Sequence, residues 1–293
     1  MAIYKLAPMD EIESGDTIEL VRQHGDVDTL NILESWLLST RQGYESELIS
    51  GKEAGMSLNE FIRKKGMGVL GTDAQDFDRF PITVKQVNTL NPGAVRFNPD
   101  KKHESLWVVL DAKPGACVYY GMSRSVTLDE VKEANEKGTL KDLLQSVEAQ
   151  PGDVFTMEAG TLYAFGAGLS MLEVEKMADQ DEVSVEEFYR SVNLEPLHAA
   201  HHQGEWVRNG HAQAQTLGVN DVFGADAYQL NGSIDLSADD KSFKALFFIS
   251  GSAVIDDDDQ TLHAEPGNPF FVEAGSKPFA VTGNCEFILV HLM

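Results

Sequence analysis

Alternation of apolar and polar residues along the chain predicts strands more often than helices. Residues 30–40 mix apolar side chains with Glu34, which a strand directs to one face while its neighbours face the other. Residues 80–90 form a similar run that carries one basic side chain, Lys85. From residue 213 to the end, strand-like runs and turns follow one another almost without interruption. The pattern therefore predicts a mainly β protein.

Helical signals are confined to a few places. Residues 57–60 read Ser-Leu-Asn-Glu, a capping box, and predict a helix that begins at the second of them and stops at Gly66. Residues 127–130 repeat the pattern, and residues 139–144 predict a further helix capped by a threonine. We therefore expect a small helical insertion at about residues 124–150, between strands.

An internal repeat indicates two related domains. Residues 152–163 and 267–278 both begin with glycine and place glutamate six residues later, followed by alanine and a second glycine. The two copies begin about one domain length apart, which is typical of a tandem repeat. Two jelly-roll barrels are the natural interpretation. We assign the N-terminal barrel, with its insertion and a linker, to residues 1–210 and the C-terminal barrel to residues 211–293.

Charge, cysteine content and the N-terminal residues limit the expected partners and location. The chain has 47 acidic and 23 basic residues among 293, a formal charge of −24, so neither nucleic acid nor an anionic membrane is an expected partner. Cys117 and Cys285 do not form a CxxC motif and are expected to be buried, reduced thiols. The N-terminus lacks the apolar run of a signal peptide, which favours a cytoplasmic location. A homo-oligomer is possible.

Several motifs resemble one family, the short bacterial form of class I mannose-6-phosphate isomerase. The similarity runs from about residue 34 to the C-terminus and includes residues 80–100, Trp107, 120–121, 151–153 and 160–162. It implies two tandem cupin barrels with a small helical insertion. It also implies interconversion of mannose 6-phosphate and fructose 6-phosphate by proton transfer between C1 and C2, assisted by zinc.

The zinc ligands implied by the resemblance are replaced in this chain. In the family, zinc is held by a glutamine or lysine and a histidine before a Pro-Asp pair, a glutamate before a tryptophan, and a histidine after Gly-Thr-Leu. These positions fall on Arg96, Asn98, Ser105 and Tyr163. A guanidinium cannot bind zinc, which takes imidazole, carboxylate or thiolate ligands. The family's active-site arginine also has no counterpart in residues 177–183.

These substitutions predict a degenerate homologue without a metal cofactor, which binds a sugar or sugar phosphate or has an altered activity in carbohydrate metabolism. The expected pocket residues are Glu34, Lys85, Arg96, Asn98, Ser105, Tyr163 and Glu173. The alternative is an active, zinc-dependent isomerase with relocated ligands such as His103 and Glu104. A third hypothesis is a barrel kept for assembly, whose pocket is filled by Tyr163 and Phe97.

Overall fold

The chain divides into two compact units. The computed structural model describes residues 2–14, 17–22, 31–99, 103–177, 183–197, 204–257 and 260–293. One unit combines Met1–Lys85 with Gln203–Met293, and the other is the continuous segment Gln86–His202. The first strands of the chain therefore belong to the same compact unit as the C-terminal barrel. The barrel boundary drawn at residue 210 from the sequence stays a prediction.

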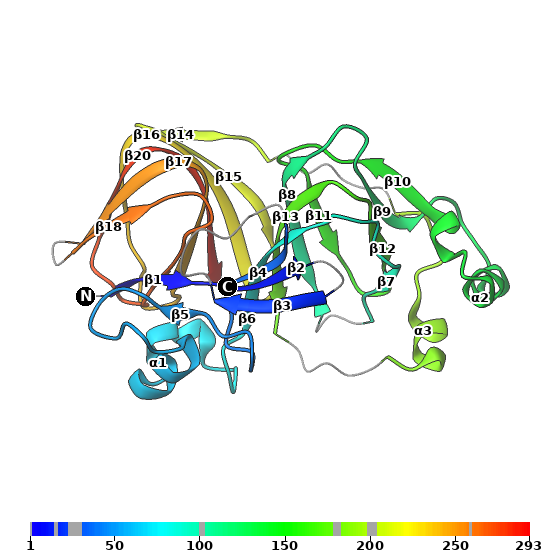
Figure 1. Ribbon diagram of the computed structural model, residues 1–293, viewed down its shortest axis with the longest axis horizontal. Coiled ribbons are helices and arrows are strands. Elements are labelled where there is room, and N and C mark those ends of the chain that lie inside the picture. The colour runs from blue at the N-terminus through cyan, green and yellow to red at the C-terminus, as the bar shows by residue number, and fades with distance from the viewer. Residues whose placement is uncertain are drawn as a thin grey trace. The chain divides into compact units, whose positions relative to one another are not determined.

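The C-terminal barrel is built from one antiparallel sheet in the discontinuous unit, with strand order β14-β15-β16-β20-β17-β19-β1-β5 and with β18 on β17 (Figure 1). The strands are β14 (Val207–Asn209), β15 (Ala212–Val219), β16 (Phe223–Leu236), β17 (Lys244–Asp256), β18 (Thr261–Ala264), β19 (Pro269–Val272), β20 (Phe279–Leu292), β1 (Ile3–Ala7) and β5 (Glu47–Leu48). β16 and β20 pair along their whole length, from Phe223 opposite Leu292 to Leu236 opposite Phe279. β17 and β18 form an antiparallel pair, from Ala253 opposite Ala264 to Asp256 opposite Thr261.

The interior of this barrel is apolar and rich in aromatic rings. Phe248, Phe270, Phe279 and Phe287 all belong to its buried cluster. Phe287 stacks on Tyr228 with ring centroids 4.9 Å apart and an interplanar angle of 2°. Full burial of such side chains contributes about 1.5–3 kcal/mol each to folding, so this core is a main source of stability.

The same unit contains a further set of strands in the order β6-β4-β2-β3, where β6 continues past the boundary between the units. They are β2 (Met9–Ser14), β3 (Thr17–Arg22), β4 (Ile32–Leu38) and β6 (Ile82–Asn88). Helix α1 (Leu58–Lys65) lies between β5 and β6 in the chain and has the predicted capping box: Ser57 accepts from the Glu60 N–H, and Glu60 accepts from the Ser57 N–H. Gly66 ends α1 as predicted, and two 3-10 helices follow, Met67–Leu70 and Thr72–Ala74.

The continuous unit contains two facing sets of strands. One has the order β11-β8-β13 and the other β10-β9-β12-β7. The strands are β7 (Arg96–Phe97), β8 (Ser105–Ala112), β9 (Cys117–Met122), β10 (Leu144–Glu148), β11 (Val154–Met157), β12 (Leu162–Phe165) and β13 (Leu169–Lys176). Their buried side chains form one cluster that includes Trp107, Val118, Phe155 and Met171. The mainly β, cupin-type fold is thus confirmed.

The helical insertion is shorter than predicted. Helix α2 (Leu128–Lys137) begins and ends as expected, but only a single 3-10 turn, Leu140–Leu143, follows it. Leu144–Glu148 is strand β10, paired with β9, so the helix predicted to run through Leu144 is wrong there. Cross-strand pairing decides this segment, because Thr139 makes no side-chain cap to favour a helix. Helix α3 (Val185–Ser191) follows β13.

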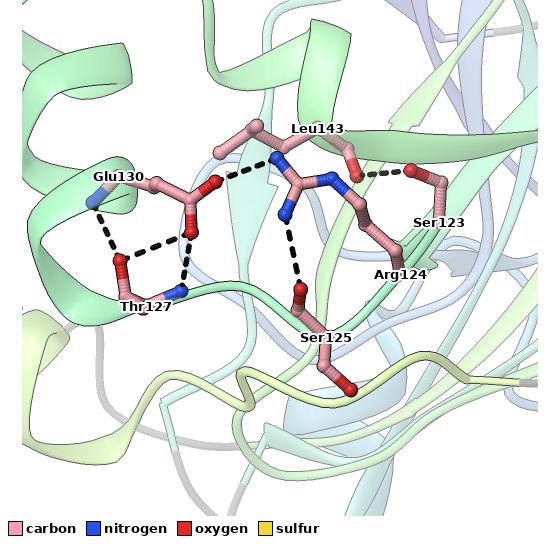
Figure 2. Close-up of polar contacts among 6 residues, drawn as sticks. All are labelled: Ser123, Arg124, Ser125, Thr127, Glu130 and Leu143. Carbon is pink, nitrogen blue, oxygen red and sulfur yellow. Dashed lines mark hydrogen bonds and ion pairs between the residues drawn. The ribbon is translucent and has the colours of Figure 1, made fainter.

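An ion pair strengthens the capping box of α2. Figure 2 shows Glu130 accepting from the Thr127 N–H at 2.8 Å and from Arg124 Nη2 at 2.6 Å, while Thr127 Oγ1 accepts from the Glu130 N–H at 3.3 Å. Arg124 also donates to the Ser125 carbonyl. The hydrogen bond from Arg124 and those from Thr127 lower the pKa of Glu130 to about 2. The carboxylate therefore stays charged at the helix N-terminus, where negative charge is favoured.

The sequence repeat is a structural repeat. All four of its glycines have positive φ: 90° at Gly152, 83° at Gly160, 80° at Gly267 and 72° at Gly275. Each copy contains a short strand, β11 or β19, between its two glycine turns.

The residue after the first glycine has the same role in both copies. Asp153 Oδ2 accepts from the Gln150 N–H at 2.8 Å, and Asn268 Oδ1 accepts from the Glu265 N–H at 3.0 Å. Both corners are therefore fixed by the same local hydrogen bond, in one barrel of each unit.

The two cysteines differ in burial. Cys285 is buried as predicted, but Cys117 is only half-buried, and both are free thiols. No helix within the described ranges is both long and apolar enough to cross a bilayer.

Candidate functional site

Strand register places three of the predicted residues on the inner face of the barrel in the continuous unit. Arg96 lies opposite Tyr163, which lies opposite Tyr120 on the next strand. Tyr120 and Tyr163 belong to the barrel's inner cluster, so this row faces inward. Asn98 follows Arg96 by two residues, and its N–H donates to the Thr161 carbonyl at 3.0 Å, which continues the pairing. Residues two apart share a face, so Asn98 also faces inward.

The facing strands contribute the other two predicted residues of this unit. Ser105 shares a face of β8 with Trp107, which is fully buried in the inner cluster. Glu173 lies opposite Trp107 on β13, two residues after the buried Met171. Ser105 and Glu173 are 4% and 3% exposed. Five of the candidate residues therefore face one interior: Arg96, Asn98, Ser105, Tyr163 and Glu173. Their role in binding stays a prediction.

Asn98 has the most unusual environment of these residues. Its side chain is 3% exposed, and its Nδ2 donates to the Met157 carbonyl at 2.5 Å. Its Oδ1 is buried without a hydrogen-bond partner within the described structure, and so is the neighbouring Thr161 Oγ1. A buried polar oxygen left unpaired costs about 1–3 kcal/mol. The inner face thus holds acceptor capacity that folding alone does not use.

Ser105 and Tyr120 are held by the barrel itself. Ser105 Oγ accepts from Trp107 Nε1 at 3.0 Å, and the Tyr120 hydroxyl donates to the Thr156 carbonyl at 2.6 Å. Burial, with a smaller contribution from the negative charge of Glu158, raises the pKa of Tyr120 to about 12. Tyr120 is therefore a neutral hydroxyl at physiological pH. It lies one strand from Tyr163, but sequence reasoning missed it because only register reveals the pair.

Arg96 and Phe97 lie on opposite faces of β7. Arg96 is exposed although its row faces inward, and β7 is the edge strand of its sheet. Phe97 instead packs outside with Phe188 of α3, with ring centroids 4.9 Å apart. The hypothesis that Phe97 fills the pocket is therefore wrong, because the alternation that turns Arg96 inward turns Phe97 outward.

Glu34 and Lys85 belong to the other unit. The Lys85 ammonium lies 4.8 Å from the centroid of the Trp36 ring, and its side chain is 7% exposed. Burial and the negative charge of Glu34 raise the pKa of Glu11, whereas a hydrogen bond from Tyr44 and the positive charge of Lys85 lower it by less. Glu34 and Glu11 are direct cross-strand partners. These two predicted residues thus form a charged cluster around Trp36.

The residues proposed as relocated ligands lie just before β8. Both His103 and Glu104 are half-buried, and the Glu104 carbonyl accepts from the Lys176 N–H at 3.3 Å. Within the described ranges, no three His, Cys, Asp or Glu side chains are close enough to hold a metal ion. Asp100 and residues 178–182, where the family's arginine would be sought, lie outside the described residues.

Comparisons with known proteins agree with this architecture. Residues 213–292 match the family model for the mannose-6-phosphate isomerase cupin domain. The mannose-6-phosphate isomerase ManA of Bacillus subtilis (strain 168) is 23% identical over 291 residues, which cover 88% of this chain and 89% of ManA.

Solved structures extend the fold similarity to nearly the whole chain. A mannose 6-phosphate isomerase from Bacillus subtilis has a TM-score of 0.83 at 20% identity and covers 99% of this chain and 100% of its own. The apo form of the enzyme from Salmonella typhimurium has a TM-score of 0.73 at 15% identity, with 100% and 99% covered. The solved structures therefore show the same fold over nearly the whole chain, and the sequence matches show that the chain is similar to mannose-6-phosphate isomerases and that residues 213–292 match the cupin domain of that family.

Proposed function

We propose that the protein binds a sugar or sugar phosphate at the inner face of the Gln86–His202 barrel and does so without zinc. The relatives it matches are named for mannose 6-phosphate, so that compound and fructose 6-phosphate are the first ligands to test. The observation that carries the proposal is Asn98, whose Oδ1 is buried with no partner within the described structure. A hydroxyl group of a bound sugar can donate to that oxygen.

The positive charge of Arg96 supports the phosphate part of the proposal. Arg96 is exposed on the inward-facing row, so its guanidinium is accessible to a ligand entering from solvent. The chain as a whole carries −24, which repels anions, so a phosphate needs a local positive group. An arginine can bind two phosphate oxygens at once, which a lysine cannot do with comparable geometry.

The side chains at the family's ligand positions do not fit zinc. A guanidinium at Arg96 has no lone pair to offer, and the amide of Asn98 is committed through Nδ2 to the Met157 carbonyl. Ser105 Oγ already accepts from Trp107 Nε1. Zinc sites are built from imidazole, thiolate and carboxylate groups, none of which occupies these four positions. We therefore derive no metal-dependent step and propose binding, or an altered activity, rather than the family's isomerisation.

Calorimetric titration tests the proposal. Mannose 6-phosphate and fructose 6-phosphate are titrated separately into the full-length protein, with and without EDTA. Saturable binding that survives EDTA is expected, and Arg96→Ala should weaken it about tenfold or more because a charged hydrogen bond is lost. Arg124→Ala is the matched control, since it removes an exposed guanidinium paired with Glu130 in the same unit. The control should bind as well as the unaltered protein.

Metal analysis separates this proposal from the zinc-dependent alternative. Near-stoichiometric zinc that survives dialysis, with isomerase activity lost in EDTA and in Glu104→Gln, would establish relocated ligands and overturn our proposal. Absence of any heat with both sugar phosphates would also overturn it. In that case the unpaired Asn98 oxygen would be a cost of the fold and not part of a binding site.

A further inference from the structure

A second polar site lies in the other unit, on the C-terminal barrel. A pocket of about 350 Å³ opens there, a volume within the range of small-molecule sites. Four adjacent strands, β15, β16, β20 and β17, supply most of its lining, and β14 and the turn between β14 and β15 supply the rest. Its polar lining is separate from the candidate site described above, and all of it belongs to the discontinuous unit.

The floor of the pocket is a straight row of polar side chains across five strands. Arg208 lies opposite Gln213, which lies opposite Gln229. Gln229 lies opposite Glu286, which lies opposite Ser250. We call Gln213, Gln229, Glu286 and Ser250 the polar ladder. The neighbouring residues Ala212, Leu230 and Cys285 point the other way, into the apolar core, so the ladder marks the reverse face of the sheet.

Hydrogen bonds along the polar ladder all converge on one carboxylate. Gln213 Nε2 donates to Gln229 Oε1, and Gln229 Nε2 donates to Glu286 Oε1 at 2.8 Å. Ser250 Oγ donates to Glu286 Oε2 at 3.2 Å from the other side. These bonds fix the orientation of both amides, so the row has a fixed arrangement of donors and acceptors before any ligand binds. Both amides keep a second N–H, and the carboxylate keeps lone pairs, for a further partner.

Two glycines shape the walls of the pocket. Gly251 follows a bulge between Phe248 and Ser250, has φ 71°, and would place a Cβ 2.0 Å from the Asn284 carbonyl oxygen. Gly232 has φ 133° and would place a Cβ 2.7 Å from the His211 ring, so only glycine lets that ring lie against β16. Bulges commonly re-aim side chains beside binding sites.

The charges of the lining decide the ligand class. The charges of Arg208 and Glu286 balance each other, and apart from the thiol of Cys285 the remaining polar side chains are amides, a hydroxyl and a histidine. Burial, and secondarily the Glu286 charge, raises the pKa of Cys285 to about 11, so its thiol is not a nucleophile at neutral pH. With no net charge and many donors and acceptors, the pocket suits a ligand rich in hydroxyl groups.

We propose that the polar ladder and the residues around it bind an uncharged polyhydroxylated ligand, a sugar or polyol, at a site distinct from the inner face of the Gln86–His202 barrel. Adjacent hydroxyls of such a ligand donate to Glu286 and accept from the free N–H groups of Gln213 and Gln229. Asn231, Asn284 and His211 surround this row and add donors and acceptors at the rim. The inference does not depend on the function proposed above.

Nuclear magnetic resonance of the 15N-labelled full chain tests the site directly. D-mannose, D-glucose and sucrose are titrated separately, and the side-chain amide signals of Gln213 and Gln229 are followed. At least one sugar should shift these signals saturably at millimolar concentrations. Glu286→Gln should weaken that sugar about tenfold or more, because it replaces an accepting oxygen by a donor. Gln229→Leu should weaken it comparably.

Thr282→Ala is the matched control. Thr282 lies on β20, on the same face as Glu286, and hydrogen-bonds Ser233 of β16 at an exposed position outside the pocket. It should change sugar affinity less than about twofold, and Arg96→Ala should leave it unchanged. The unfolding temperature of each variant confirms that it is folded. Absence of shifts with all three sugars, or undiminished binding in both folded ladder variants, would overturn the proposal. Shifts confined to Asn98 would equally overturn it.

Discussion

The two barrels share a glycine corner but differ in what they bury. In the C-terminal barrel the inner cluster consists of apolar side chains, including Phe248, Phe270 and Phe287. In the barrel of the continuous unit, the inner face also carries Asn98 and Glu173, at 3% exposure each. The first interior maximises apolar burial, whereas the second gives up part of that stabilisation for buried polar groups.

The difference in interior polarity is not a requirement of the fold that the two barrels share. Identical turns at Gly152 and Gly267 build the same corner, so the fold does not require polar residues inside. Among the described residues, buried polar groups of this kind occur in the interior of the continuous unit and not in the other, which supports the binding role proposed for that barrel. The C-terminal barrel carries its polar ladder on the opposite face of its sheet, where it does not interrupt the core.

The largest effect should come from truncating the apolar interior. Phe287→Ala removes a fully buried ring that stacks on Tyr228 and lies 5.3 Å from Phe248, so it should lower the free energy of unfolding by about 3–5 kcal/mol. Chemical denaturation measures the change. Phe97→Ala, at a half-buried ring of the other unit, should cost less. Equal losses in the two variants would contradict the view that the apolar barrel supplies the larger stabilisation.

A smaller loss is expected from the polar interior. Asn98→Ala leaves the Met157 carbonyl without its buried donor and should lower the free energy of unfolding by about 1–3 kcal/mol. Sugar-phosphate binding should weaken at the same time in calorimetry. A more stable Asn98→Ala protein would show that the unpaired oxygen costs more than the amide contributes, and would strengthen the contrast between the interiors.

The smallest effect is expected on stability at acidic pH. Burial alone would raise the pKa of Asp226, but interaction with His291, the hydrogen bond from Thr216 and nearby positive charge outweigh it and lower that pKa. Its stabilising contribution is therefore present above its unfolded pKa of about 4 and is lost as the pH falls through the lower folded value. Asp226→Asn should unfold with a shallower decline in unfolding temperature below about pH 4. Differential scanning fluorimetry measures the unfolding temperature at each pH. The same decline below about pH 4 in Asp226→Asn and in the unaltered protein would contradict a stabilising role for the Asp226 carboxylate.

Local signals in the sequence predicted local structure well. The capping boxes at Ser57 and Thr127 define α1 and α2 because their hydrogen bonds close within four residues. The glycines of the repeat predicted the two corners because positive φ is a property of single residues. The five candidate pocket residues of the continuous unit came from the family resemblance, because alternation along one strand does not say which strands face each other.

Features set by distant partners escaped prediction. β10 was expected to be helical because its pairing with Tyr119 and Met122 of β9 is not visible in the residues 144–148 themselves. In the polar ladder, Gln229 and Glu286 form a hydrogen bond although they lie 57 positions apart, and only register aligns them. The unpaired oxygen of Asn98 likewise depends on what surrounds it, since the residue type does not reveal how many of its donors and acceptors are paired.

The pairing of β1 with β19 has a consequence for synthesis on the ribosome. Ile3 of β1 lies opposite Val272 of β19. β1 is therefore synthesised well before the strand with which it must pair. Gln86–His202 is continuous and can complete its pairing while the rest is still being translated. We therefore expect the middle of the chain to fold before its beginning, with the N-terminal strand remaining exposed to chaperones in the interval.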